Sequence, residues 1–415
     1  MSKKLNIGLF GFGVVGGGLY QVLNQSGLLN ARIRKIVVKD PLKVRSLPTE
    51  KFSFDPADVL DDPRINVVVE LINDSEAAYE IVKAALSNGK HVVSANKKLI
   101  AEHLDELILL AKEFKVSFLY EASVAGSIPI LRNLEEYYNN DTLSSVQGIV
   151  NGTTNYILTQ ANEGIPYKEA LRKAQELGFA ETDPAADVDG FDSKYKLILL
   201  IKHAFGVVIG TEDIFNYGIR HVKPEDVAYA AEKGYRIKLF ARSEKAGDRI
   251  SGFVAPHFIG KDHFAYQVDN EFNAVVVEAA FSDRQLFTGK GAGAFPTASA
   301  VLSDISALQF NYQYEYRKSF QANPSQFSDD FFLKIYLGSR YIEAIQEIPF
   351  YKIDEVFQSK AYNYQTGWVK FSELKQFNFN NLEELFFAVL PEPFLDEAEF
   401  SQTAAEHLFI QVFNN

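Results

Sequence analysis

The chain has 415 residues, of which 47% are hydrophobic and 23% are charged. These proportions are ordinary for a folded globular protein with a sizeable core, and the length allows about two or three domains. A formal net charge of -12 argues against nucleic acid or an anionic membrane as the main partner, because both attract basic surfaces. The chain has no cysteine, which excludes disulfides, thiolate metal sites and cysteine nucleophiles.

The remaining global features predict a cytoplasmic protein. The 7 histidines show no metal-ligand spacing, so no zinc site is expected. The N-terminal segment MSKKLNIGLFGFG lacks a signal-peptide cleavage pattern. No stretch approaches the roughly 20 apolar residues that span a membrane, so no membrane partner is expected either.

Residues 1–130 alternate segments typical of strands with segments typical of helices. Parallel strands need long crossover connections, which are usually helices. This alternation therefore predicts an α/β fold, a Rossmann-type doubly wound parallel sheet that binds a dinucleotide. The expected strands are KLNIGLFGFG, ARIRKIVVKD, INVVVELI, HVVSANK and VSFLYEASV, and the expected helices are Val14 to Ser26, DSEAAYEIVKAALSNG and about Glu102 to Phe114.

The pattern changes in the rest of the chain. Residues 131–320 mix helices with strands, which predicts an α+β substrate domain. A helix near 297–310 is expected to return to the first domain and complete it. Residues 321–415 are rich in aromatic and acidic residues and predict a small C-terminal α+β module, in which FFLKIYL and HLFIQVF are strands.

The first strand is followed by glycines in the order G-x-G-x-x-G, at Gly11, Gly13 and Gly16. Glycines in this position permit a tight turn and a close approach of the backbone to a pyrophosphate, which the N-terminus of the next helix stabilises. The alternative is a purely structural glycine turn. The cofactor-binding candidates in this turn are Gly11, Phe12, Gly13, Val14, Val15 and Gly16.

The end of the second strand bears on the choice of cofactor. An acidic residue there binds the ribose hydroxyls of NAD, and a basic residue accommodates the 2′-phosphate of NADP. The sequence offers both Lys39 and Asp40, with Lys43 and Arg45 nearby. We expect Lys39 to contact the cofactor and NADP to be preferred, with NAD as the alternative.

Lys97 follows the HVVS strand, near the carboxyl edge where open α/β sheets bind ligands. A lysine there can contact the nicotinamide ribose or a substrate oxygen, and the alternative is a solvated lysine at the start of a helix. Lys98 is the clearer candidate for the surface. Ser94, at the end of the same strand, is counted with Lys97 among the cofactor-binding candidates.

The stretch AETDPAADVDGFDSKYK combines many carboxylates with two lysines, between two expected helices. Functional groups are frequent in such loops, yet Asp183-Pro184 is also turn chemistry, and Asp192 or Ser193 would be ordinary N-caps. Lys196 is expected in the first turn of the following helix, where the helix dipole disfavours a cation. An ammonium held against carboxylates in a cleft can supply a proton to a developing alkoxide.

Taken together, the motifs resemble homoserine dehydrogenase of the bacterial type over about residues 5 to 310. The resemblance implies reversible reduction of L-aspartate 4-semialdehyde to L-homoserine by NAD(P)H, in threonine, methionine and isoleucine biosynthesis. The matching motifs are GFGVVG, VVVELI, GKHVVSANK, YEASVAGSIPI, IVNGTTNYILT, FAETDPAADVDGFDSKYK, GYRIKLFA and GKGAGAFPTASAVLSDI.

The resemblance also implies roles for particular residues. Lys97 matches a catalytic lysine that contacts substrate and nicotinamide, and Lys196 matches the lysine taken as proton donor to the carbonyl oxygen. Glu181 and Asp192 match carboxylates that hold the substrate. Asp187 is left open between the substrate pocket and holding Lys196 in place.

Further roles follow from the same resemblance. Gly293, in GKGAGAFPTASA, matches a backbone site near the cofactor. The segment EASVAGSIPI matches one that binds a monovalent cation, usually Na+, which carbonyl oxygens suit as hard ligands. Members of the family are commonly dimers or tetramers built through the substrate domain, so the resemblance implies a homodimer or homotetramer with residues 131–320 as the catalytic and oligomerisation domain. The implied cation ligands are the backbone carbonyls of Glu121, Val124, Gly126 and Ile128.

The sequence departs from the family pattern in three places, one of which is Ser127, where a glycine is common. Asn73-Asp74 stands where Gly-Gly is usual after VVVELI. Many bacterial members end in an amino-acid-sensing ACT module with a Pro-Gly turn after its first strand. FFLKIYLGSRYIEAI has the strand without that turn, so we expect a diverged ACT-like module and do not extend the resemblance to threonine feedback.

Three alternatives bear on function. Aspartate-semialdehyde dehydrogenase works through a cysteine thioester, and this chain has no cysteine. Sugar oxidoreductases that pair a Rossmann domain with a similar lysine lack NGTTNYILT and the ETDP to DSKYK arrangement. A catalytically inactive homologue that binds a metabolite as a regulator is the alternative from a different class.

Overall fold

The computed structural model describes residues 4–27, 29–320, 324–377, 379 and 384–403. The chain forms two compact units, and each is built from separated segments of the sequence. The predicted domain limits at residues 130 and 320 stay predictions. The first unit comprises Met1–Val146, Ile198–Asp213 and Asn273–Pro324, and the second comprises Gln147–Leu197, Ile214–Phe272 and Ser325–Asn415.

A six-stranded parallel sheet forms the centre of the first unit. Its strand order is β3-β2-β1-β4-β5-β6, so the chain leaves β1 in one direction and returns to β4 on its other side. This order confirms the predicted Rossmann-type doubly wound fold. The short β3 was not predicted. The strands are β1 (Leu5–Phe10), β2 (Ala31–Val37), β3 (Phe52–Ser53), β4 (Val67–Glu70), β5 (His91–Ser94) and β6 (Phe118–Leu119).

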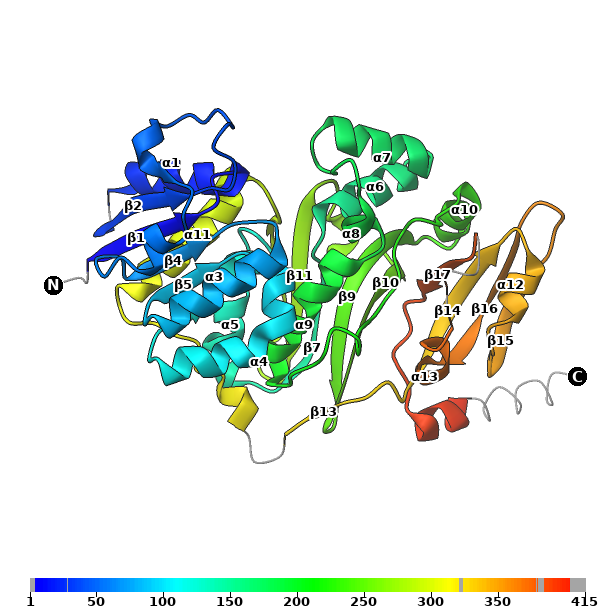
Figure 1. Ribbon diagram of the computed structural model, residues 1–415. Coiled ribbons are helices and arrows are strands. Elements are labelled where there is room, and N and C mark those ends of the chain that lie inside the picture. Colours follow the sequence, from blue (N-terminus) through cyan, green and yellow to red (C-terminus); the bar gives the residue numbers. More distant parts are fainter. Residues whose placement is uncertain (1–3, 28, 321–323, 378, 380–383, 404–415) are drawn as a thin grey trace, which may run out of the picture. The chain divides into compact units, whose positions relative to one another are not determined.

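Helices cover this sheet in two pairs, α1 with α11 and α3 with α4 (Figure 1). The returning helix expected near 297–310 is α11, and Gly18 of α1 allows a close approach, because a Cβ there would lie 2.5 Å from Ala294 O. The helices are α1 (Val14–Ser26), α2 (Ala57–Leu60), α3 (Ser75–Ser87), α4 (Lys97–Glu113), α5 (Leu131–Glu135) and α11 (Ala294–Leu308).

Helix α4 begins earlier than the sequence suggested. It starts at Lys97 instead of about Glu102, because the side chain of Asn96 accepts a hydrogen bond from Leu99 N at 3.1 Å and caps the first turn. His103 has non-helical backbone angles (φ -127°, ψ 20°), so the helix is irregular near the expected start. The short first segment therefore carries Lys97.

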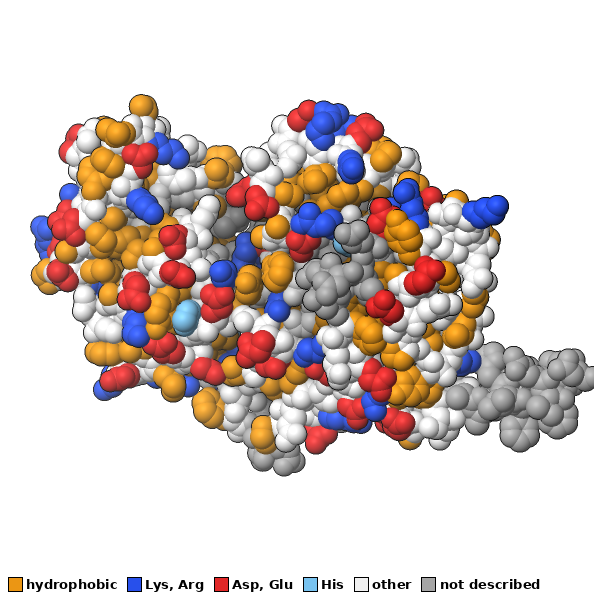
Figure 2. Space-filling model, turned by 45° about the vertical axis from the view of Figure 1, so that its right-hand side comes forward, with side chains coloured by type: hydrophobic (Ala, Val, Ile, Leu, Met, Phe, Trp, Pro, Cys, Tyr) orange, Lys and Arg blue, Asp and Glu red, His pale blue; other side chains and the backbone are white. Residues whose placement is uncertain are grey.

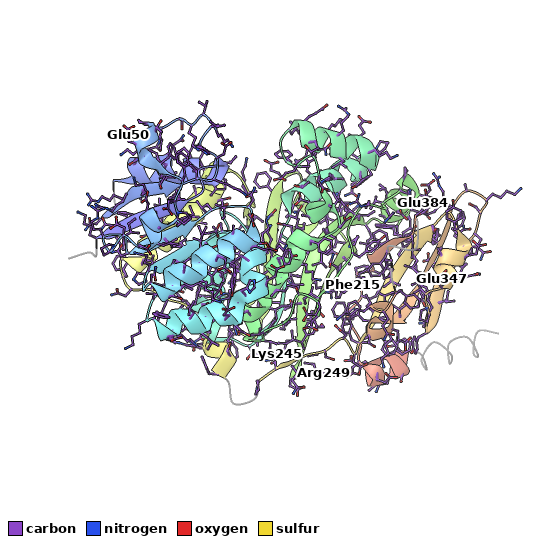
Figure 3. All side chains as sticks on the ribbon, viewed as in Figure 1. Glu50, Phe215, Lys245, Arg249, Glu347 and Glu384 are labelled. Atoms are coloured by element: carbon purple, nitrogen blue, oxygen red, sulfur yellow. The ribbon has the colours of Figure 1, made fainter. Side chains whose placement is uncertain are left out.

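Further strands pair side by side in the order β12-β11-β7, and β7 and β11 each continue from one unit into the other along the chain. In the second unit, β9 and β10 form a long antiparallel hairpin, and Lys245 and Arg249 lie at its tip (Figure 3). Two short strands, β8 (Phe215–Asn216) and β13 (Gln326–Phe327), pair with β10. The longer strands are β7 (Leu143–Ile149), β9 (Arg236–Ala246), β10 (Arg249–Ile259), β11 (Phe272–Ala279) and β12 (Asp283–Lys290).

The helices of the second unit include a short one that was not predicted. Helix α8 lies inside the acidic stretch that was expected to be a loop. Helix α9 begins at Phe191, so the expectation that Asp192 or Ser193 caps it is wrong. Lys196 is its sixth residue and lies beyond the first turn, where the dipole effect is weaker. The helices are α6 (Gly152–Asn162), α7 (Tyr167–Glu176), α8 (Ala185–Val188), α9 (Phe191–Phe205) and α10 (Pro224–Glu232).

In the C-terminal part of the second unit, the described elements from β14 to β17 follow in the order β-α-β-β-α-β, and residues 397–403 after them are helical. Its strands lie in the order β17-β14-β16-β15, and β17 also pairs with β10 at His257 and Val389. The expected strand FFLKIYL is confirmed as β14, whereas the expected strand HLFIQVF lies outside the described residues. The elements are β14 (Phe332–Ser339), α12 (Ile342–Gln346), β15 (Lys352–Phe357), β16 (Asn363–Lys370), α13 (Phe371–Leu374) and β17 (Phe386–Val389).

The exposed side chains carry both signs of charge. Acidic and basic side chains are intermixed on the face drawn in Figure 2. Within the part of the chain that the structure describes, every helix is too short or too polar to cross a membrane.

Candidate active site

The glycine turn after β1 leaves no room for side chains at two of its positions. Gly11 has φ +92°, and a Cβ there would lie 2.5 Å from Leu71 O. A Cβ on Gly16 would lie 2.3 Å from Gly11 O. Gly13, the N-cap of α1, has open space around it. The turn therefore has the tight bend and the open backbone position that a pyrophosphate requires.

The residues around this turn leave its helix N-terminus accessible. Val14 is 71% exposed, and Val15 is half-buried. The ring of Phe12 packs edge-on against the rings of Tyr20 and Phe52 at the side of the turn. The first turn of α1 carries no acidic residue that would oppose an anion.

Lys39 and Asp40 lie beyond the end of β2, and both are exposed. The carboxylate of Asp40 accepts a hydrogen bond from Leu42 N at 2.8 Å, which closes a local turn. Of the two side chains that can discriminate between NAD and NADP, the acidic one is thus engaged by its own loop.

Lys97 and Lys98 differ in their surroundings. Lys97 is half-buried at the first position of α4, while Lys98 is exposed and has Glu102 at 3.9 Å. Ser94 is fully buried at the end of β5, and its hydroxyl donates to Glu70 Oε2 at 2.6 Å. Ser94 is therefore held inside the sheet edge next to the helix that carries Lys97.

Gly293 is the N-cap of α11, with φ +125° and ψ 163°. This backbone conformation is accessible mainly to glycine. Like Gly13, Gly293 places the start of a helix directly after a glycine, where backbone N–H groups lack helical partners.

In the second unit, Lys196 is buried between two oxygen atoms. Its Nζ lies 2.7 Å from Asp192 Oδ2, one turn earlier on α9, and donates to Val150 O at 2.5 Å. The side chain of Lys196 is only 9% exposed and that of Asp192 only 5%. Such a buried ammonium is stable only when its charge is compensated, and Asp192 supplies the compensation.

Asn151 connects the carboxylates of this network, and sequence reasoning did not single it out. Its Nδ2 donates to Asp187 Oδ1 at 2.7 Å and to Asp192 Oδ2 at 2.9 Å. Its Oδ1 accepts from Thr154 N at 2.8 Å and caps α6. An asparagine directly before GTT is an N-cap signal, but its two donor contacts are visible only in three dimensions.

The other acids of the stretch have separate partners. Asp183 Oδ1 accepts from Ala185 N in a turn, and Asp189 forms a two-fold ion pair with Arg220. The contact of Asp183 agrees with the turn expected at Asp183-Pro184, and the contacts of Asp189 are those of a structural ion pair. Glu181 is exposed, and its backbone oxygen accepts from Gln175 Nε2 at 3.1 Å.

The segment expected to bind a cation is buried in the first unit. Among the described residues, none donates a hydrogen bond to the carbonyl oxygens of Val124, Gly126 or Ile128. Gly126 has φ +58°, and a Cβ there would lie 2.4 Å from Gly291 O. These buried carbonyl oxygens without donors fit a hard monovalent cation.

Ionisable groups also surround this segment. The carboxylate of Glu121 accepts from Leu131 N at 2.8 Å and Arg132 N at 2.9 Å, and Glu121 N donates to Asp304 Oδ2 at 2.9 Å. Burial raises the pKa of Asp304 to about 8, with a further contribution from the neighbouring Glu121. No group of three or more His, Asp or Glu side chains in the described part of the chain is arranged to hold a metal ion.

Comparisons with known proteins agree with this arrangement. A family model for the NAD-binding domain of homoserine dehydrogenase matches residues 11–121, and a homoserine dehydrogenase model matches residues 129–306. A homoserine dehydrogenase of Bacillus subtilis is 36% identical over 96% of this chain and 94% of its own length. The chain belongs to the homoserine dehydrogenase family.

Solved structures of homoserine dehydrogenases share the fold of this chain. A homoserine dehydrogenase from Thiobacillus denitrificans superposes with a TM-score of 0.81 at 31% identity, covering 94% of this chain and 99% of that one. A hyperthermophilic archaeal homoserine dehydrogenase in complex with NADPH gives a TM-score of 0.65 at 27% identity, covering 75% and 99% of the two chains.

Membership of the homoserine dehydrogenase family makes the protein an NAD(P)-dependent oxidoreductase with homoserine dehydrogenase activity. The NAD-binding model matches from Gly11 onward, so the matched region includes the glycine turn. The sugar-oxidoreductase and inactive-homologue alternatives receive no support from these similarities.

Proposed function

We propose that Lys196 donates the proton to the carbonyl oxygen when L-aspartate 4-semialdehyde is reduced to L-homoserine. The observation that carries this proposal is the buried contact of 2.7 Å between Lys196 Nζ and Asp192 Oδ2, which holds the ammonium in one place. A positioned ammonium can stabilise the oxygen as it gains charge and then protonate it. In the reverse direction the same amine accepts the proton of the hydroxyl.

The reduction needs a hydride and a proton, and the two come from different groups. The reduced nicotinamide supplies a hydride to the aldehyde carbon, and the C=O double bond becomes a C–O single bond as the oxygen takes a proton from Lys196. Lys97 contacts the nicotinamide and the substrate from the start of α4. Its half-buried position, in contrast to exposed Lys98, supports this role.

The carboxylates bind the ammonium group of the substrate. Asn151 orients Asp187 and Asp192 through its two donors, so both acceptors keep a fixed direction. Glu181 joins them as a substrate-binding residue, a role that rests on its match to the family motif. For Asp187, the contact with Asn151 favours a place in the carboxylate set around the substrate.

The cofactor is NADP, with NAD as the alternative. Lys39 is exposed beyond β2, whereas the carboxylate of Asp40 is bound to Leu42 N. An exposed ammonium suits the 2′-phosphate. The NADPH complex of the archaeal relative is consistent with this choice.

A monovalent cation, Na+, binds the carbonyl oxygens of Glu121, Val124, Gly126 and Ile128. Its task is structural, because it neutralises buried carbonyl dipoles and steadies the segment that contains them. The proposal is supported by the buried carbonyl oxygens of Val124, Gly126 and Ile128, which lack donors among the described residues.

The enzyme acts in the cytoplasm as a homodimer or homotetramer and serves threonine, methionine and isoleucine biosynthesis. These assignments rest on the resemblance to the family. Light scattering coupled to gel filtration measures the mass of the assembly, and a monomer at micromolar concentration would contradict the oligomeric assignment.

The deciding experiment for the site is a crystal structure with NADP+ and L-homoserine. The hydroxyl oxygen of homoserine should lie within hydrogen-bonding distance, roughly 3 Å, of Lys196 Nζ. The substrate ammonium should face Asp187, Asp192 or Glu181. A hydroxyl bound elsewhere, with Lys196 still closed on Val150 O, would refute the assigned roles.

A further inference from the structure

Glu70 is a buried carboxylate at the carboxyl end of β4, beside the strand that leads into the glycine turn at Gly11 to Gly16. It lies opposite Phe10 on β1 and Ser94 on β5, and it is 0% exposed. Burial raises the pKa of Glu70 to about 7, although two hydrogen bonds act in the opposite direction. A buried carboxylate is seldom the most stable choice for such a position, so its specific contacts need an explanation.

The first contact of Glu70 fixes the loop after β4. Its Oε1 accepts from Ile72 N at 2.6 Å, and this bond bends the chain directly after the strand. The neighbouring Leu71 O lies against Gly11, where it leaves no space for a Cβ. Glu70 therefore holds the segment that forms one wall of the glycine turn.

The second contact of Glu70 reaches the start of α4. Its Oε2 accepts from Ser94 Oγ at 2.6 Å, and Ser94 Oγ in turn accepts from Asn96 N at 3.1 Å. Asn96 is the N-cap of α4, and Lys97 is the next residue.

A further hydrogen bond of Asn96 closes these contacts into a ring. Its Nδ2 donates to Ile72 O at 3.1 Å, so the loops after β4 and β5 are tied together in one ring of hydrogen bonds. The members of the ring are Glu70, Ile72, Ser94 and Asn96.

We propose that Glu70 is a positioning residue. It fixes the position of the first turn of α4, and thereby that of Lys97, relative to the glycine turn. The proposal rests on the role of Lys97 proposed above. Glu70 and Ser94 anchor the ring to neighbouring parallel strands, so the loss of Glu70 removes two of its four hydrogen bonds, the one to Ile72 N and the one to Ser94 Oγ. A displacement of about 1 Å in a group that contacts the reacting atoms can lower a rate by roughly two orders of magnitude.

Two substitutions of Glu70 separate its shape from its charge. In Glu70→Ala both acceptors are lost, and we expect kcat to fall at least about tenfold and the Kd of NADPH, measured by cofactor fluorescence, to rise several-fold. Glu70→Gln keeps one acceptor for Ile72 N and can donate to Ser94 Oγ, so we expect it to restore most of kcat. Equal loss in both variants would overturn the proposal, and Ser94→Ala takes the place of Glu70→Ala if the latter fails to fold.

A matched pair of serine variants tests the link to α4. Ser94→Ala removes the hydroxyl between Glu70 and Asn96 and should lower kcat roughly as Glu70→Ala does. Ser53, on β3, makes the same kind of contact, because its hydroxyl donates to Asp58 Oδ2 at 2.6 Å. Ser53→Ala should leave kcat unchanged, and a similar loss in both serine variants would contradict the proposal.

A double-mutant cycle with Lys97→Ala distinguishes this inference from the role of Lys97 itself. If Glu70 acts through Lys97, Glu70→Ala should change kcat by less than about twofold once Lys97 is alanine. The same loss in both backgrounds would refute the positioning role. A Lys97→Ala enzyme with nearly normal kcat would instead refute the proposed function of Lys97.

Discussion

Asp192 Oδ2 is shared by two donors, Lys196 Nζ at 2.7 Å and Asn151 Nδ2 at 2.9 Å. Asn151 comes from the start of α6 and Lys196 from the second turn of α9, so one carboxylate oxygen joins two helices. The geometry explains how a buried ammonium is kept in one orientation. A catalytic proton donor needs this fixed direction more than it needs exposure.

Replacing Lys196 should remove the proton donor without unfolding the protein. We expect Lys196→Ala to lower kcat by roughly two or more orders of magnitude, the scale of general acid-base groups. The steady-state rate of NADPH oxidation with aspartate semialdehyde measures kcat. Lys194→Ala, two positions away on α9, is the control and should keep most of its activity. Nearly normal kcat in Lys196→Ala would rule out the proposed role.

Asn151 should be needed for its donors as well as for its cap. Asn151→Ser keeps an acceptor that can cap α6 but loses both Nδ2 contacts, and Asn151→Asp keeps the cap and adds a negative charge beside Asp187 and Asp192. We expect kcat/KM for the amino-acid substrate to fall about tenfold or more in both variants, while circular dichroism stays unchanged. Unchanged kcat/KM in the Asn151→Ser enzyme would show that Asn151 serves only as a helix cap.

Cofactor preference should depend on Lys39. Lys39→Ala should lower kcat/KM with NADPH roughly tenfold, the scale of one charged contact, and leave kcat/KM with NADH nearly constant. Lys168→Ala, which removes an exposed lysine of α7, controls for the change in net charge. If NADPH preference survives in Lys39→Ala, another residue reads the 2′-phosphate.

The cation site can be tested through its glycine. A methyl group in Gly126→Ala would meet Gly291 O and force the segment apart. We expect activity and thermal midpoint of the wild type to be higher in NaCl than in choline chloride of equal ionic strength, and Gly126→Ala to lose this difference. Gly164→Ala bears a similar positive φ in open space and should keep it. The absence of any Na+ effect in the wild type would count against the site.

Asp226 should make stability depend on pH. Burial raises its pKa from the ordinary 3.8 to about 7, although the hydroxyls of Tyr336 and Tyr362 donate to it at 2.9 Å and 2.5 Å. The folded state thus retains a proton that the unfolded chain releases above about pH 4. The resulting stability is full below that pH and is lost as the pH rises through about 7.

The comparison with Asp226→Asn isolates this effect, because other titrating groups cancel in the difference. Lys223 and Glu225, the nearest charged neighbours on the chain, are unchanged. Between pH 5 and 8, the wild type should lose up to about 3 kcal/mol relative to Asp226→Asn, which corresponds to a few degrees in apparent Tm. A constant difference across that range would show that Asp226 remains ionised in the folded protein.

Local sequence signals were sufficient for several elements of the first unit and for its fold class. The glycine turn, the buried strands such as VVVE and the helix Val14–Ser26 depend on spacing within a few residues, and all three occur as predicted. The family motifs also placed Lys97 and Lys196 among the candidate residues, because a motif preserves the order of functional groups along the chain.

Only the tertiary structure decided which polar groups meet. Asn151 lies 41 positions from Asp192, and Glu70 lies 24 positions from Ser94, so no local pattern connects them. The start of α4 was also misplaced. Its cap is a local bond from Leu99 N to Asn96 Oδ1, but the bond from Asn96 Nδ2 to Ile72 O, which helps to orient Asn96, comes from a distant segment. Hydrogen bonds between distant segments depend on how helices and strands pack, and that packing is a property of the whole chain.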